Sequence, residues 1–363
     1  MAGAGIGFFA GNEYGPVKLK LLKSLATVTS PQFSTCDKDI SGLNGLPTAT
    51  LVFTASSATT AAVCFGFDYS PSLNIVSAFL GAGVQYSTNY GVTWTTGVAT
   101  GITTPYSTQW HSGLGLFIGS SQDVTTGSMS CWISTDGMTY TRAGQTTLSA
   151  SSFNNAYSPT LDIVLLPGCA TTANSIFWAT ASTLSSTTKW TAGTITTSSC
   201  APRKVTWLTK TNKFIVSGDL TGTTVAYNTS TDGKTWTLNT SPSGFTALAN
   251  NSIVIAFAEA PNLGTGSGRI VAIQFTGSIG TKPIAYSDNG GSTWTMVTLA
   301  AGTYGLWSIQ WVEQVQMFIV TGTNANNLLM SKDGINWTKY TGPSGSRAQC
   351  VILDPVNYPQ WQK

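Results

Sequence analysis

The acidic residues are the first candidates for chemistry, because two carboxylates that flank a bond can hydrolyse a glycosidic linkage. The 363-residue chain contains 14 of them, and four lie where loops at strand ends could gather them on one face. These four are Asp123, Asp162, Asp219 and Glu259. No two of them have the spacing of a recognisable catalytic pair, and turn capping or solvation explains each more simply. We therefore assign no catalytic residue.

The cysteines and the single histidine, His111, form no recognisable metal or redox motif. The six cysteines are Cys36, Cys64, Cys131, Cys169, Cys200 and Cys350. No two of them have the close spacing of a zinc or redox site, and one histidine adds little to such a site. Three of them, Cys64, Cys131 and Cys350, lie in apolar runs, which favours free thiols in the core, with disulfides as the alternative. We predict no metal and no cofactor.

The elements that position these side chains are indicated by a short phrase that recurs five times. Each copy has Ser, then Asp or Asn two positions later, then Gly, then an aromatic residue. The copies span residues 87–94, 134–140, 230–236, 287–294 and 331–337. The Asp or Asn side chain can bond the amides of its own turn, and Gly can take the positive φ that a reversal needs. Each copy therefore predicts a β-hairpin, called a repeat hairpin below.

The spacing of the copies predicts the blades of a β-propeller. The aromatic residues that end them, including a degraded sixth copy that ends at Trp190, are 43 to 58 residues apart. A four-stranded propeller blade needs roughly 40–50 residues. Between the copies, Trp110, Trp207 and Trp311 each precede a run that contains Phe-Ile, and we interpret these segments as the two inner strands of blades. For the three tryptophans, packing between blades is a better explanation than stacking on a ligand.

The repeated phrase resembles the Asp-box, or BNR repeat, the Ser-x-Asp-x-Gly-x-x-Trp signature on the outer hairpins of sialidase-like β-propellers. The resemblance covers the chain from about residue 47 to residue 337 and implies an all-β ring. We predict seven blades, of which the last is shared by a strand at 48–54 and a strand at Cys350–Leu353. Six blades with an extra strand are the alternative. Pairing of the two ends would close the ring and remove an exposed edge.

The catalytic pattern of sialidases does not carry over to this chain. That family binds the substrate carboxylate through three arginines, and the first lies before the first box in an Arg-Ile-Pro-like element. Here no arginine precedes Arg142, and Arg269-Ile270 is followed by Val271 instead of proline. The aspartates of the phrase are structural even in the enzymes of that family. We therefore expect the protein not to be an enzyme.

The composition argues against direct binding to nucleic acid and against a membrane span. Charged residues make up 9% of the chain, against about a quarter in typical domains. The net charge of +3 is unclustered, so we predict no direct binding to nucleic acid. The uncharged stretch 49–67 is interrupted by polar residues, which indicates two strands and no membrane span. A surface rich in Ser, Thr, Asn and Gly is typical of proteins outside cells or on virus particles.

The N-terminal residues 1–45 contain no copy of the phrase, and we predict that they form an attachment arm beside a propeller domain at 46–363. The apolar start is followed by its lysines, Lys18, Lys20 and Lys23, which is the reverse of the order in a secretion signal. We therefore expect an uncleaved terminus that a partner covers. The residues expected to bury against that partner are Ala2, Ile6, Phe8 and Phe9.

These observations favour a non-enzymatic structural or interaction protein of a virus particle, such as a bacteriophage tail, fibre or capsid-associated component. We expect it to belong to an oligomeric assembly, to bind other virion proteins through the arm, and to contact a host-surface glycan or receptor through its loops. Two alternatives are a glycan-cleaving hydrolase of sialidase-like architecture and a secreted, extracellular lectin-like module.

Overall fold

The computed structural model describes most of the chain from residue 64 to residue 340 and three short segments before it. The described residues are 19–22, 33–35, 54–56, 64–80, 83–123, 127–146, 152, 154–169, 174–195, 200–220, 226–240, 245, 255–274, 283–300, 305–313, 316–322, 328–340 and 350–353.

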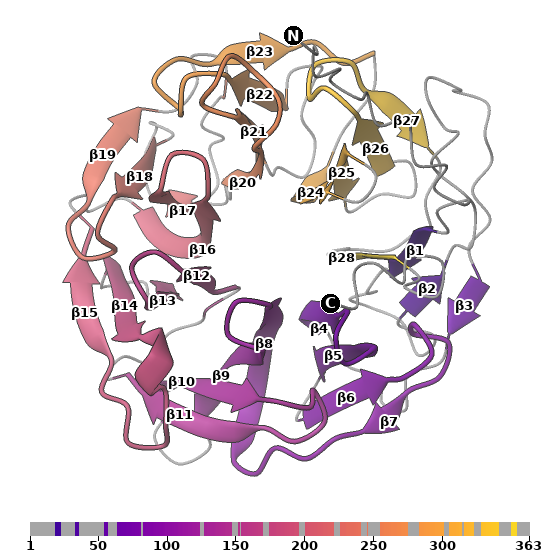
Figure 1. Cartoon of the computed structure of the whole chain (residues 1–363), viewed down its shortest axis with the longest axis vertical. Coiled ribbons are helices and arrows are strands. Elements are labelled where there is room, and N and C mark those ends of the chain that lie inside the picture. The colour runs from indigo at the N-terminus through magenta and orange to yellow at the C-terminus, as the bar shows by residue number, and fades with distance from the viewer. Residues whose placement is uncertain are drawn as a thin grey trace, which may run out of the picture.

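Six antiparallel four-stranded sheets stand as blades in a ring (Figure 1). The first three blades are β4 (Cys64–Ser70), β5 (Ile75–Leu80), β6 (Gly83–Ser87) and β7 (Thr95–Thr96); β8 (Ile102–His111), β9 (Leu116–Asp123), β10 (Met129–Ser134) and β11 (Thr141–Gln145); and β12 (Ala156–Ser158), β13 (Ile163–Cys169), β14 (Asn174–Thr180) and β15 (Thr191–Thr194). The last three are β16 (Cys200–Leu208), β17 (Lys213–Leu220), β18 (Ala226–Ser230) and β19 (Thr237–Thr240); β20 (Ile255–Ala260), β21 (Arg269–Gln274), β22 (Ile284–Ser287) and β23 (Thr295–Val297); and β24 (Leu306–Val312), β25 (Met317–Gly322), β26 (Leu328–Ser331) and β27 (Thr338–Tyr340).

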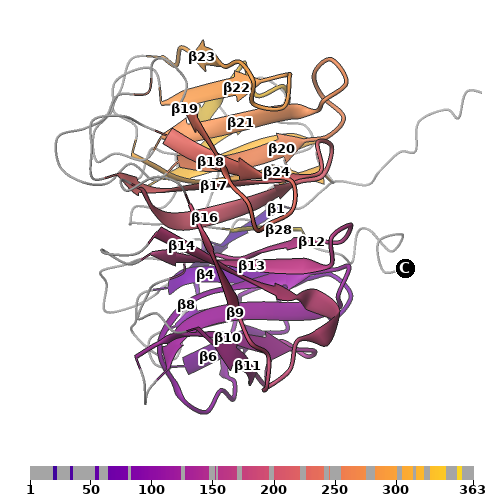
Figure 2. The same cartoon turned by 90° about the vertical axis from the view of Figure 1, so that its left-hand side faces the viewer.

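Within each blade the strands follow chain order, and the first strand lies innermost. Figure 2 shows the ring from the side, with β8–β11 low and β20–β23 high. A single 3-10 turn, η1 (Ala181–Thr183), lies between β14 and β15. No helix in the described parts of the chain has the length and hydropathy of a membrane span. The stretch 49–67, predicted to hold two strands, contains β3 (Thr54–Ser56) and the start of β4.

Two further pairs of strands lie between the last blade and the first (Figure 1). In one pair, β1 (Leu19–Leu22) runs antiparallel to β28 (Cys350–Leu353), and in the other β2 (Phe33–Thr35) runs antiparallel to β3. Strand β28 contacts both β24 and β4, so it connects the two ends of the row of blades. The six four-stranded blades match the six-blade alternative, and the prediction of seven is not supported.

The predicted partner of the C-terminal strand was wrong. We predicted pairing of Cys350–Leu353 with 48–54, whereas β28 pairs with β1, and Thr54 begins β3. Both N-terminal segments are strand-like, and local sequence does not specify which of them reaches an edge formed more than 300 residues later. Strands β1 and β2 fall within the predicted arm 1–45. The residues expected to contact a partner, Ala2, Ile6, Phe8 and Phe9, lie outside the described residues, so that interface stays a prediction.

The core consists of side chains packed between neighbouring blades. One cluster, for example, joins Ile118 and Cys131 of the second blade to Val164 and Phe177 of the third. The second strands of three blades carry a fully buried phenylalanine opposite a half-buried tryptophan, with ring centres 4.6 to 5.0 Å apart. These pairs are Trp110–Phe117, Trp207–Phe214 and Trp311–Phe318. The predicted packing role of the three tryptophans is confirmed.

The repeated phrase forms the hairpin between the third and fourth strands of five blades, as predicted. In the second blade Ser134 Oγ donates to Asp136 Oδ1 at 2.8 Å and accepts from Gly137 N at 2.8 Å. The same Asp136 oxygen accepts from the amides of Met138 and Thr139, each at 2.8 Å. Gly137 has a φ of +71°, which residues with a Cβ rarely adopt.

The other copies repeat this bonding with small changes. Where the turn is one residue longer, Asn89 and Asn289 replace aspartate, and Oδ1 of each accepts the amide of the threonine four positions on, at 2.9 Å. The degraded sixth copy, between β14 and β15, lacks both Asp and Gly and follows η1. Its Trp190 donates from Nε1 to Ala143 O of the preceding blade at 2.9 Å. An acceptor oxygen at the turn, rather than a charge, is therefore the feature the five hairpins share.

Candidate functional site

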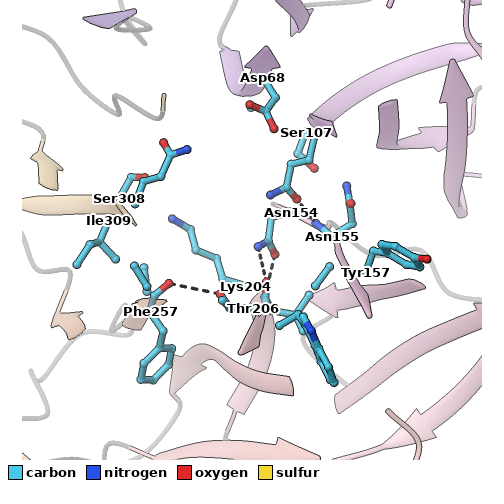
Figure 3. A pocket seen from close by; sticks show the side chains of 18 of the residues that line it. Asp68, Ser107, Asn154, Asn155, Tyr157, Lys204, Thr206, Phe257, Ser308 and Ile309 are labelled. Atoms are coloured by element: carbon cyan, nitrogen blue, oxygen red, sulfur yellow. Dashed lines mark hydrogen bonds between the residues drawn. The ribbon is translucent and has the colours of Figure 1, made fainter. Parts of the chain in front are cut away.

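The inner strands of all six blades line one cavity of about 450 Å³ (Figure 3). Its wall is formed by residues 66–68 of β4, 107–109 and 111 of β8, 154–157 around β12, 204–207 and 209 around β16, 256–259 of β20 and 308–311 of β24. Polar side chains dominate several of these segments. The cavity is therefore the place where the ring brings residues from distant parts of the sequence together.

Lys204 points into this cavity (Figure 3). A β-bulge between Pro202 and Lys204 interrupts the pairing of β16 with β17, and bulges redirect side chains. The ammonium donates from Nζ to the carbonyl oxygen of Trp307 on β24 at 2.9 Å and lies 5.3 Å from the centre of the Trp307 ring. Removal from bulk water lowers the pKa of Lys204 to about 8, because burial disfavours the charged form.

His111 is held against the third blade. Its Nε2 lies 2.5 Å from Asn155 Oδ1, and Asn155 donates from Nδ2 to Ile118 O at 2.9 Å. Since the Asn155 amide group points at a carbonyl, its oxygen faces the ring, and His111 donates through Nε2. Burial lowers the pKa of His111 to about 4, although the bond to Asn155 acts in the opposite direction. The imidazole is therefore neutral at pH 7.

The carboxylates of the cavity wall are bonded to neighbouring blades. Asp68 accepts from the amides of Tyr69 at 2.8 Å and of Trp110, on the next blade, at 2.9 Å. Glu259 accepts through Oε2 from Thr209 Oγ1 at 2.8 Å and from Lys210 N at 3.1 Å, both from the preceding blade. These carboxylates therefore help to hold the blades together.

The four acidic candidates from the sequence are not gathered in one site. Of them, Glu259 lines the cavity, whereas Asp162 lies beside η1 and accepts from the amide of Ser182 at 3.0 Å and from its hydroxyl. Asp123 and Asp219 lie in β9 and β17, and their side chains are outside the described part of the structure. Asp68 was not among the predicted site residues, although it stands out in the sequence as the only charged residue between Asp39 and Asp123.

Uncharged polar side chains also link successive blades around the cavity. Gln109 Oε1 accepts from Asn155 N at 2.6 Å. Asn154 bonds both backbone groups of Val205, since its Nδ2 donates to the carbonyl oxygen at 2.7 Å and its Oδ1 accepts from the amide at 2.9 Å. Thr206 donates to Phe257 O at 3.4 Å. The wall thus uses much of its hydrogen-bonding capacity to maintain the ring.

Arg269 joins two repeat hairpins and takes no part in the cavity. Its guanidinium forms two bonds of 2.7 Å with Asp288 in the hairpin of its own blade. It also donates to Asp333 O in the hairpin of the next blade at 2.6 Å. Arg269, the arginine that most resembled the sialidase element, therefore connects two hairpins and has a structural role.

Within the described residues, no three His, Cys, Asp or Glu side chains form a group that could hold a metal ion. Cys131 is a free, buried thiol in β10, and burial raises its pKa above the ordinary value. This agrees with the predicted free core thiol at that position. The side chains of Cys64 and Cys350 lie outside the described part, so their state stays a prediction.

The blades and the cavity that they enclose define the chain as a β-propeller. It is similar to a Lactobacillus plantarum protein of solved structure, with a TM-score of 0.61, 13% identity, and coverage of 93% of this chain and 99% of the other. A Bacteroides fragilis protein provisionally named a 6-phosphogluconolactonase gives a TM-score of 0.63, 12% identity, and coverage of 95% and 100%. A Bacteroides uniformis protein of the same provisional name gives a TM-score of 0.60 and 13% identity, with coverage of 93% of this chain and 99% of the other. At these identities the likeness shows the fold alone. No protein-family model and no curated protein sequence matches the chain.

Proposed function

We propose that the protein is a non-enzymatic structural and interaction component of a virus particle. The observation that carries the proposal is the use of its acidic side chains: those of the repeat hairpins and of the cavity wall accept hydrogen bonds from backbone amides. A carboxylate that is held by backbone amides in this way serves to fix the turn or the neighbouring blade. The low charge and the hydroxyl-rich composition fit an exposed particle component.

We also propose that the repeat hairpins belong to the Asp-box class. Five hairpins share the Ser–Asp or Ser–Asn contact and the Ser–Gly contact with nearly the same distances. In this proposal the hairpins form a scaffold, and the loops of the ring contact a glycan or receptor on the host surface. The apolar N-terminal residues before β1 bind another virion protein.

The experiment that tests this proposal follows the protein through particle purification. Particles from a lysate of the source culture are separated on a density gradient, and the chain is detected with an antibody in the fractions that contain packaged genome. Full-length protein is compared with a variant that lacks residues 1–18, which leaves β1 and its partner β28 in place. We expect the full-length chain in the particles and loss of the truncated chain. Absence of the full-length chain from purified particles would refute the proposal.

A hydrolase is the second candidate, because one cavity holds a lysine, a histidine and two carboxylates. Purified protein is assayed on a sialoside and on 6-phosphogluconolactone, the latter because of the names given to two proteins of similar fold. We expect no turnover of either substrate. The three arginines that would hold a sialoside carboxylate are not matched in the sequence. Turnover that is lost in a Lys204→Met variant would replace the structural proposal with an enzymatic one.

A further inference from the structure

The cavity has a feature that a purely structural ring does not require, namely a cationic side chain without a carboxylate partner. Lys204 points into the cavity and is partly buried, with protein around most of the side chain. Among the described side chains the one ion pair joins Arg269 and Asp288, far from this wall. Burying an unpaired ammonium is unfavourable, and a neutral side chain would serve a scaffold better.

We propose that the cavity binds the oxyanion group of a small ligand, a carboxylate or a phosphate or sulfate ester, through Lys204. This site is independent of the proposed role in a particle. An ammonium has three N–H donors, and the carbonyl of Trp307 takes one of them. The other two are available to an acceptor in the cavity, and two acceptor oxygens of one oxyanion match them.

The charged and titratable groups that face Lys204 from the other blades leave it without a counter-ion. Asp68 on β4 bonds two amides, and Glu259 on β20 directs one oxygen to Thr209 and Lys210. His111 on β8 is neutral at pH 7, and Tyr157 on β12 is a neutral phenol. Burial alone lowers the pKa of Lys204, with no opposing shift from a nearby carboxylate.

Two glutamines of the wall extend the site. Gln109 uses its oxygen to accept from Asn155 N, which leaves its NH₂ group for the cavity. Gln310 lines the cavity from β24, and its side chain makes no hydrogen bond to the described residues. A volume of about 450 Å³ lies within the range of small-molecule sites. The cavity therefore suits a ligand of about the size of a substituted monosaccharide, with one anionic group and neutral polar groups.

The test measures binding of two probes, sulfate and gluconate, by isothermal titration at pH 6.5 and pH 9.5. The charge of each probe is constant over this range. The wild-type protein is compared with Lys204→Met, which keeps the length of the side chain, and with Lys210→Met, which removes an exposed lysine outside the cavity lining. Thermal melting confirms that the variants fold.

We expect millimolar or tighter binding of at least one probe at pH 6.5 and a loss of about tenfold or more at pH 9.5, because the ammonium loses its proton near pH 8. Lys204→Met should lose binding, and Lys210→Met should retain it. Binding of sulfate alone indicates an ester of phosphate or sulfate, and binding of gluconate alone indicates a carboxylate. No binding of either probe, or equal binding by Lys204→Met, overturns the proposal. If Lys204→Met does not fold, equal affinity of the wild type at both pH values overturns it.

Discussion

At the scale of single residues, the aspartates and asparagines of the repeat hairpins can both bond a threonine hydroxyl, aspartate as the acceptor and asparagine as the donor. In the shorter turn Asp232 accepts from the hydroxyl of Thr235 at 2.7 Å. In the longer turns Asn89 and Asn289 donate their NH₂ group to a threonine hydroxyl at 2.8 and 2.7 Å. A hydroxyl can both donate and accept, so threonine is compatible with either partner. The turn therefore depends on one acceptor oxygen, which accepts from two amides in the shorter turns and from one in the longer turns.

The first prediction concerns that oxygen. Replacing Asp232 by alanine should lower the free energy of unfolding by about 1–2 kcal/mol, because the amides of Lys234 and Thr235 lose their acceptor. Asp232→Asn should cost less than half as much, since asparagine fills this role in two other blades. Urea denaturation of the three proteins measures the difference. Equal losses for both variants would show that the charge, and not the acceptor, stabilises the turn.

The second prediction concerns acid. Partial burial raises the pKa of Asp232, but hydrogen bonds from Thr235, Lys234 and Ser230 outweigh it, and the pKa lies below the ordinary value of 3.8. The same direction holds for Asp136 and Asp333. A carboxyl whose pKa is depressed by folding stabilises the fold above its unfolded pKa, and this contribution disappears as the pH falls through the folded value.

We therefore expect the melting temperature to be nearly constant from pH 7 to pH 5 and to fall progressively below pH 4. In Asp232→Asn the fall should be shallower, because one of these three groups no longer titrates. Differential scanning calorimetry between pH 2 and pH 7 provides the comparison. Parallel curves for the two proteins would contradict the assignment.

At the scale of elements, the blades are held to each other by side chains that bond the backbone of the next inner strand. Asn154 is the clearest case, because it satisfies both polar groups of Val205, a residue only 1% exposed. Asp68 and Gln109 make the equivalent contact between other blades. Such bonds help to fix the register between neighbouring sheets, together with the apolar side chains packed between them.

The third prediction tests this connection. Asn154→Ala should lower the free energy of unfolding by about 1–3 kcal/mol, because it leaves a buried amide and carbonyl of Val205 without partners. The control is Asn262→Ala, which removes one exposed bond to Glu313 and should change stability by less than about 0.5 kcal/mol. Chemical denaturation of both variants decides the matter. Equal, small effects would show that water replaces the side chain at Val205.

The sequence predicted the local elements well and the long-range ones poorly. Each repeat hairpin is closed by residues within a few positions of each other, such as Ser134, Asp136 and Gly137. The types of these residues and their spacing are therefore enough to predict the hairpin. The cavity could not be predicted in this way. Asn154 and Val205 are far apart in the chain, and the place of Lys204 depends on a bulge that no turn signal announces. The pairing of strands that are distant in the sequence could not be predicted either, and the partner predicted for β28 was wrong.

At the scale of the whole molecule, the ends of the row of blades are joined through β28, which lies against β24 and β4 and pairs with β1. The fourth prediction removes this strand. Deletion of residues 350–363 should expose the edge of β1 and the inner faces of two blades, and so lower the melting temperature or cause aggregation. Deletion of 354–363 alone, which spares β28, is the control. A monomer that lacks 350–363 and melts like the full chain would refute closure by β28.

The register of β1 and β28 also determines how the ring responds to mechanical load. Leu19 pairs with Leu353 and Leu22 with Cys350, so both chain ends leave the pair from the same side. A force applied to the two termini therefore separates the strands one hydrogen bond at a time, beginning at Leu19 and Leu353, and does not shear all the bonds at once. We therefore expect the β1–β28 pair to separate at a low force applied to the termini. A force applied across the blades would instead have to break many contacts between neighbouring sheets at the same time.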